Sequence, residues 1–180
     1  MRRKLTMILM ALCVLFVSIQ AEAGTFGGKW ATNPTYYIST SNAYYSEFTQ
    51  AVSSWNSALS SIGASISIKS NTATGASFIP SVDYYGSTGW NGYCKPGPDP
   101  FSGTYTYVTY QLNRSYMDSY TSAKRKAICT HELGHALGLS HNTYTNPQTL
   151  MYEGGSSVYY DSWGLSSPTI TDIADLNSLY

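Results

Sequence analysis

Three histidines and one glutamate stand at spacings that could build a hydrolytic metal centre. They are His131, Glu132, His135 and His141, and the chain has no other histidine. Residues four apart lie on one face of a helix, so His131 and His135 can reach the same ion. Glu132 is rotated by about 100° from His131, which places its carboxylate beside the ion rather than on it.

Gly138 supplies the turn that the third histidine needs. Glycine readily adopts a left-handed conformation and can end the helix, so the chain can bring His141 back to the same ion. Three imidazoles with one open position are typical of a catalytic zinc, whereas a structural zinc has four protein ligands. A histidine pair at this spacing also occurs by chance in ordinary helices, but the continuation to Gly138 and His141 makes chance a poor explanation.

The elements that must position these residues can be read from the hydrophobic pattern. Strands are expected at 34–40, 65–70, 77–85 and 104–112, with a short one at 90–94 inside a loop rich in glycine and proline. The metal helix should begin at 119–122 and end near 138, and a last helix should start at 169–171, after a loop at 142–164. The helix between the first two strands has an apolar stripe, formed by Tyr44, Phe48, Ala51, Val52, Trp55 and Leu59.

The first 23 residues have the pattern of an export signal. Three basic residues precede an uncharged apolar run at 7–19, and Ala21-Glu22-Ala23 is an A-x-A cleavage site. The apolar run is too short for a typical membrane span. We therefore expect residues 1–23 to be a signal peptide and 24–180 to form one catalytic domain, which is secreted outside the cell or into a periplasm.

The charge of the expected mature chain excludes some partners. Residues 24–180 contain seven basic and nine acidic side chains, a net charge of −2. The one short basic run, Lys124-Arg125-Lys126, is typical of a solvated helix face, so nucleic acid is excluded as a partner. No other segment is apolar enough for a membrane. We expect a monomer that meets a protein or peptide substrate.

Two cysteines, Cys94 and Cys129, remain after removal of the signal. An even number in an oxidising compartment predicts a disulfide, which would close a loop with 34 residues between the two cysteines. In the chain-entropy model such a bond stabilises a protein by roughly 3–4 kcal/mol. The alternative is a zinc thiolate, but Cys129 is two residues before His131 and so points away from the metal.

These residues resemble the metzincin clan of zinc peptidases and, within it, the matrixins. The motif from His131 to His141 matches in every fixed position, Leu150-Met151-Tyr152 resembles the Met-turn, and 171–180 resembles the terminal helix. The resemblance implies an α+β fold with a twisted five-stranded mixed sheet, two long helices and a C-terminal helix. It also implies that Met151 is an apolar floor beneath the zinc, and that an edge strand holds the peptide substrate as an additional strand.

Other positions depart from the matrixin pattern or extend it. No histidine remains for a second, structural zinc. Glu153-Gly154-Gly155 replaces the usual wall proline, so the resemblance gives no side-chain preference. Residues 94–99 are similar to an inhibitory cysteine switch, although they lie in mid-domain. The resemblance implies that Asp172 bonds backbone near the Met-turn. Structural Ca²⁺ would need loop oxygens such as those of Asp83 and Asp99, but isolated aspartates are usually only solvated.

The sequence thus predicts a secreted zinc metalloendopeptidase with Glu132 as general base. One alternative is a non-catalytic zinc-binding module, such as an adhesin or toxin component. Another is a non-protein amide hydrolase that uses the same zinc. Glu132 favours an enzyme, because a domain without activity has no chemical need for that acid.

Overall fold

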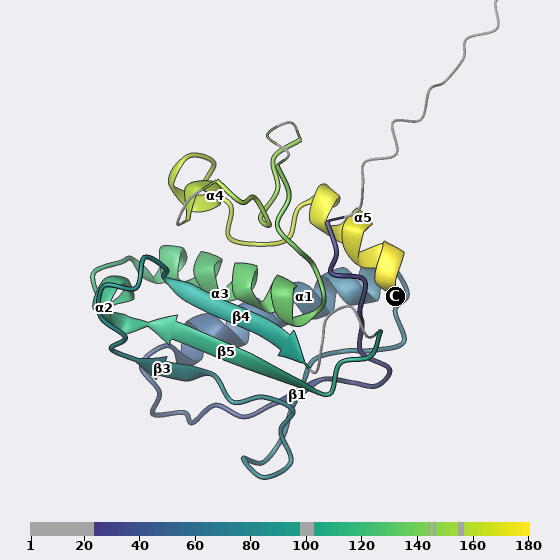
Figure 1. Cartoon of the computed structure of the whole chain (residues 1–180), viewed down its shortest axis with the longest axis horizontal. Helices are drawn as coiled ribbons and strands as arrows, with labels where there is room; N and C mark the ends of the chain where they lie inside the picture. The colour runs from purple at the N-terminus through teal and green to yellow at the C-terminus, as the bar shows by residue number, and fades with distance from the viewer. Residues whose placement is uncertain (1–23, 98–102, 144, 146, 155–156) are drawn as a thin grey trace, which may run out of the picture.

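The computed structural model describes residues 24–97, 103–143, 145, 147–154 and 157–180. The expected signal peptide and Asp99 lie outside the described residues. The described elements, in chain order, are β1 (Thr35–Tyr36), α1 (Tyr45–Ser61), β2 (Lys69–Ser70), β3 (Ser81–Asp83), β4 (Gly92–Gly97), β5 (Tyr107–Asn113), α2 (Arg114–Met117), α3 (Ser122–Ala136), α4 (Val158–Asp161) and α5 (Ile170–Leu179). Figure 1 shows their arrangement.

The strands form a mixed but interrupted sheet. β5 lies between β3, to which it is parallel, and β4, to which it is antiparallel. β1 and β2 form a separate parallel pair, and one bridge from Tyr36 to Phe78 links β1 to the segment before β3. An α+β fold with a mixed sheet is therefore confirmed. A single continuous sheet of five strands is not, because the hydrogen bonds divide the strands into two groups.

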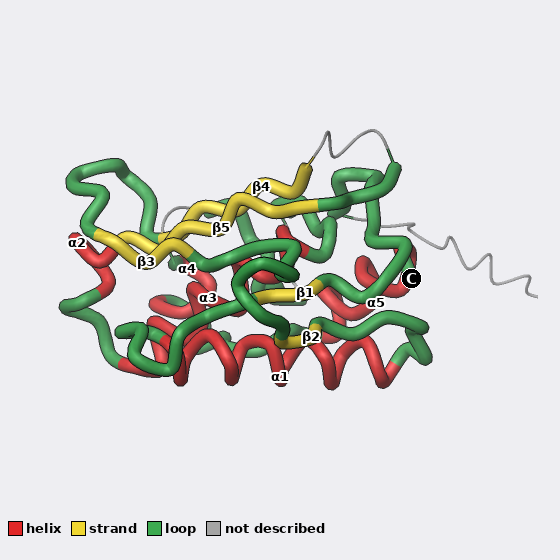
Figure 2. Tube along the Cα trace, turned by 90° about the horizontal axis from the view of Figure 1, so that it is seen from below, coloured by secondary structure: helices red, strands yellow, loops and turns green. Residues whose placement is uncertain are grey.

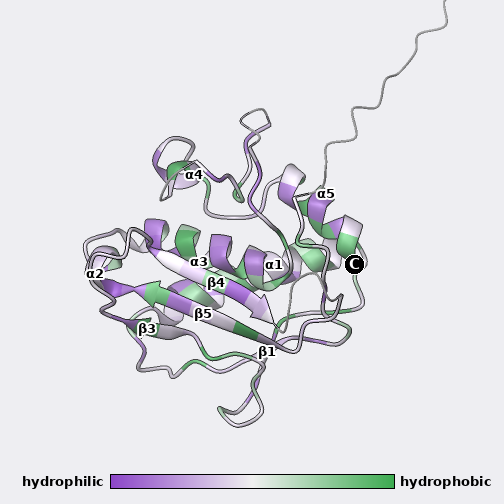
Figure 3. Cartoon of the chain, in the orientation of Figure 1, coloured by the Kyte–Doolittle hydropathy of each residue, from purple (hydrophilic) through white to green (hydrophobic). Residues whose placement is uncertain are grey.

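The core lies between the strands and the long helices. Figure 2 shows β3, β4 and β5 on one side of the molecule and α1 on the other. All six residues of the predicted apolar stripe on α1 are buried. Phe48 of α1 packs against Phe78 and Tyr110, with ring centroids 6.4 and 5.4 Å away. Figure 3 shows that α1 and β5 both carry hydrophilic as well as hydrophobic residues, as expected of elements with one buried face.

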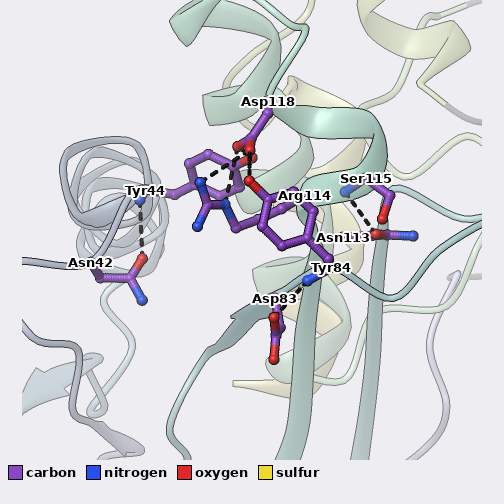
Figure 4. Close-up of polar contacts among 8 residues, drawn as sticks. All are labelled: Asn42, Tyr44, Asp83, Tyr84, Asn113, Arg114, Ser115 and Asp118. Carbon is purple, nitrogen blue, oxygen red and sulfur yellow. Dashed lines mark hydrogen bonds and ion pairs between the residues drawn. The ribbon is translucent and has the colours of Figure 1, made fainter.

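A carboxylate joins three elements at one end of the fold (Figure 4). Asp118 follows α2 and accepts hydrogen bonds from the hydroxyls of Tyr44 and Tyr84 and from the guanidinium of Arg114. The hydrogen bonds from Arg114 and Tyr44 lower the pKa of Asp118 from its ordinary value to about 2. Asn113 caps α2 by accepting from the Ser115 N–H at 3.0 Å. This cluster fixes the start of α1 and the ends of β3 and β5.

The segment after the third histidine, which was predicted to be a loop, contains a short helix. The segment 142–164 contains α4, which begins after Ser157, a residue in the left-handed region with φ of 67°. A helix of four residues is too short to produce a hydrophobic period, which explains why the pattern did not reveal it. None of the described helices has the length and apolar character needed to cross a bilayer.

Candidate metal centre

α3 begins and ends close to the predicted positions. Thr121 caps its N-terminus, with the side-chain oxygen accepting from the Lys124 N–H at 3.3 Å. At the other end Gly138 has φ of 104°, and a Cβ there would lie 2.6 Å from the Gly28 carbonyl oxygen. Both constraints favour glycine. The turn at Gly138 reverses the chain, so His141 returns to α3 as the spacing predicted.

The structure brings the three histidines together. The Nε2 atom of His141 lies 3.0 Å from the Nε2 atoms of both His131 and His135. The Nδ1 atoms of His131 and His135 lie 2.8 Å from the carbonyl oxygens of Leu150 and Leu139. A carbonyl can only accept, so each Nδ1 carries the proton and each Nε2 presents a lone pair to the cluster.

This donor set fits a tetrahedral zinc ion. Zinc–nitrogen bonds of about 2.1 Å in a tetrahedron separate two ligand nitrogens by roughly 3.4 Å, close to the spacing here. A metal ion between them would take up the lone pairs that His131 and His135 direct at the Nε2 atom of His141. Within the described residues, these histidines form the only group of three or more His, Cys, Asp or Glu side chains that could hold a metal. Asp83, which we named as a possible calcium ligand, belongs to no such group.

Burial sets the protonation of the site. It lowers the pKa of His135 to about 3 and that of His131 well below its ordinary value, and it also lowers the pKa of His141. The neighbouring imidazoles also lower the pKa of His131 and of His135. The histidines are therefore neutral at neutral pH, which is the form that binds a metal. Burial raises the pKa of Glu132 to about 8, and a cation on the histidines would favour its ionised form.

Glu132 lies where α3 faces β4. It is 6% exposed, and a Cβ added to Gly92 of β4 would lie 2.6 Å from its Cγ. Gly92 thus leaves room for the glutamate side chain, and any larger residue would push it aside. The spacing of the motif predicted that Glu132 lies beside the metal, but the sequence indicated no role for Gly92. The two residues are far apart in the chain, so no local pattern predicts their contact.

A cavity of about 170 Å³ opens at the histidines. Its walls come from α3 and the turn after it, from β4 and the residues before it, and from α4 and residues that precede it. The lining residues are Trp90, Asn91, Gly92, His131, Glu132, His141, Tyr152, Glu153, Ser157 and Tyr159. Tyr159 of α4 stacks on His131 with a centroid distance of 4.6 Å and an interplanar angle of 4°. The role of Tyr159 was not predicted from the sequence. Tyr159 is 28 residues after His131, and no regular spacing relates the two residues across the intervening loop.

Met151 is fully buried beside the metal helix. A Cβ on Gly134 of α3 would lie 2.4 Å from its Sδ, so the sulfur rests directly on that glycine. Asp172 of α5 holds this segment from below by accepting from the N–H groups of Leu150 and Met151 at 3.0 and 3.1 Å. The expected contact between Asp172 and this backbone is therefore present.

The predicted disulfide is absent from the structure, where Cys94 and Cys129 are free thiols. Cys129 is completely buried in the core near Glu47 and Tyr110, whereas Cys94 is a half-buried residue of β4. Counting cysteines gives an even number but not the distance between the sulfurs, which decides whether a bond can form. Neither thiol belongs to the metal cluster, so the zinc-thiolate alternative is not supported either.

The comparison with protein families agrees with this geometry. A family model described as "Dual-action HEIGH metallo-peptidase" matches residues 28–158, which is more than two thirds of the chain. The matched range includes the three histidines, Glu132 and Met151. This family supports a zinc metallopeptidase of the metzincin type, but it is a different family from the matrixins, so the matrixin assignment is not confirmed. No curated protein matches the sequence significantly.

Proposed function

The chain belongs to the HEIGH metallopeptidases, and on that premise we propose that it is a secreted zinc endopeptidase with Glu132 as general base. The observation that carries the proposal is the site itself. Three neutral imidazoles direct their Nε2 atoms to one point, and a buried carboxylate on the next residue of the same helix lines the same cavity. Peptidase activity implies a protein or peptide substrate.

The residues of the chain divide the work of peptide hydrolysis. His131, His135 and His141 would hold the zinc ion, which would polarise the scissile carbonyl and lower the pKa of a bound water. Glu132 would accept the proton of the attacking water and return it to the leaving amine nitrogen. The carbonyls of Leu139 and Leu150 keep the imidazoles in the tautomer and orientation that direct Nε2 to the metal. Met151 and Asp172 support the site from beneath as a rigid floor.

β4 is the element suited to hold the substrate backbone. It is the terminal strand of its three-stranded sheet, and Gly92 and the preceding residues line the metal cavity. A peptide added to the outer edge of β4 as a further strand would pass over the histidines with its carbonyls within reach of the metal. This arrangement is the part of the matrixin resemblance that we retain as a proposal.

A cleavage assay tests the function directly. The purified chain should cleave casein or a peptide library, lose that activity with a chelator, and recover it with Zn²⁺. Glu132→Gln should keep one zinc per chain by elemental analysis and lose at least about a hundredfold in kcat. His141→Ala should lose zinc itself. Zinc binding without cleavage of any peptide would instead favour a non-catalytic binding module.

Export is tested separately. We expect the exported protein to begin at Gly24, and N-terminal sequencing of the protein collected outside the cytoplasm would show it. A full-length chain retained in the cytoplasm would contradict secretion without affecting the proposed chemistry.

A further inference from the structure

We propose that the cavity at the metal centre selects a basic side chain of the substrate, lysine or arginine, through Glu153 and the aromatic rings around it. The inference rests on the proposed peptidase function and names the substrate class for the same site. It concerns the residue of the peptide that enters this cavity beside the bond to be cut.

The lining of the cavity has the composition of a cation site. Three aromatic residues, Trp90, Tyr152 and Tyr159, share it with the exposed carboxylate of Glu153, and no lysine or arginine is among the described residues that line it. Aromatic faces attract ammonium and guanidinium groups through the ring quadrupole, and a carboxylate adds a charged partner. An apolar substrate side chain would pack on the rings but would gain nothing from the carboxylate.

The aromatic walls are held in place before any substrate arrives. The ring of Tyr152 lies so close to Gly154 that a Cβ there would be 1.9 Å from it, and Trp163 packs on the ring at 4.9 Å. Tyr159 is fixed by its stack on His131. A rigid wall reduces the entropy lost on binding, so the site can discriminate between side chains.

Backbone hydrogen bonds with Asn142, the residue after His141, hold Glu153 in place. The N–H of Asn142 donates to the Met151 carbonyl at 2.9 Å, and the N–H of Glu153 donates to the Asn142 carbonyl at 3.0 Å. These bonds hold Glu153 beside the segment that carries His141. Among the described residues, no cationic side chain forms a salt bridge with Glu153.

The other charges of the cavity fit a long cationic side chain better than a short one. A divalent metal on the histidines would repel a cation placed directly on it, and Glu132 offsets part of that charge. Glu153 is exposed, whereas His131 and Glu132 are buried, so Glu153 lies toward the open side of the cavity. The flexible stem of lysine or arginine can carry its charge away from the metal to this carboxylate.

The test compares matched peptides within each variant. Library cleavage followed by mass spectrometry first locates the selective position, and three fluorogenic peptides then carry Lys, Met or Glu there. We expect kcat/KM for the Lys peptide to exceed that for the Met peptide about tenfold, and the ratio to fall as salt increases. Glu153→Gln should bring the ratio to within about twofold of one. Glu153→Lys should make the Glu peptide the better substrate.

A ratio taken within one variant is independent of how much of that protein is folded or loaded with zinc. Asp83→Asn, which removes an exposed carboxylate outside the cavity, is the matched control and should keep the tenfold preference. Equal cleavage of the Lys and Met peptides by the parent would overturn the inference and leave the peptidase function standing. A preference that survives Glu153→Gln would also overturn it. No zinc-dependent cleavage of any peptide would overturn the proposed function itself.

Discussion

The indole N–H of Trp55 donates a hydrogen bond to the carbonyl oxygen of Thr130 at 2.7 Å, one residue before the first metal-binding histidine. Trp55 is completely buried on α1, and its ring also lies against Gly134 of α3. A single side chain therefore fixes both the distance and the rotation of the metal helix relative to α1. The position of the histidines therefore depends on the packing of α3 against α1. The zinc motif in the sequence gives no information on that packing.

Replacing Trp55 by phenylalanine should lower stability. The change removes the hydrogen bond and leaves a cavity, and together these cost about 2–4 kcal/mol of the free energy of unfolding. Urea unfolding followed by circular dichroism measures the loss. Ser53→Ala on the exposed face of α1 is the control and should change stability by less than about 0.5 kcal/mol. A Trp55→Phe protein as stable as the parent would mean that the indole is not what joins α1 to α3.

The zinc-free protein should be most stable near pH 6.5. Burial lowers the pKa of His131 and His135 far below 6.5, so the unfolded chain binds protons that the folded chain rejects, and stability rises as pH increases toward 6.5. Burial raises the pKa of Glu132 from 4.5 to about 8, so the folded chain keeps a proton that the unfolded chain loses, and stability falls as pH increases through that range. Below pH 6.5 the proton uptake of the unfolded histidines outweighs the effect of the glutamate, and between pH 6.5 and 8 the effect of Glu132 outweighs that of the histidines.

Glu132→Gln isolates the glutamate contribution to this profile. In the variant, the decline of unfolding free energy between pH 6.5 and 8 should disappear, while the rise below pH 6.5 remains. Chemical denaturation of chelator-treated protein at a series of pH values measures both limbs. A decline that persists unchanged in the variant would assign it to another group.

The local parts of the site could be predicted from the sequence, whereas its walls could not. His131 and His135 are one helical turn apart, and a glycine at 138 is typical of the turn that ends a helix. The spacing alone therefore predicts that the three histidines come together. The stack of Tyr159 on His131 depends on the path of the intervening chain. The same reasoning explains why the disulfide prediction was wrong. The even number of cysteines can be counted in the sequence, but the separation of Cys94 and Cys129 is set by how β4 packs on α3.

Gly92→Ala should reduce catalysis while leaving the metal bound. The new methyl group would come within 2.6–2.8 Å of the Glu132 side chain, so the carboxylate must move from its place in the cavity. We expect kcat to fall at least about tenfold, because displacement of the proposed general base by a fraction of an ångström is costly. Zinc content should stay at the parent level. Lys95→Ala on the exposed side of β4 is the control, and equal activity of Gly92→Ala and the parent would remove Gly92 from this role.

Gly134 and Met151 should show energetic coupling. A Cβ on Gly134 would lie 2.4 Å from the Met151 Sδ, an overlap that costs about 1–3 kcal/mol and outweighs the gain of about 1 kcal/mol from alanine in a helix. In a Met151→Ala background the sulfur is gone, so Gly134→Ala should cost about 1–2 kcal/mol less than in the parent. Urea unfolding of the four proteins of this double-mutant cycle gives the coupling energy. Additive effects would contradict direct contact, and with it the role of Met151 as the floor of the metal centre.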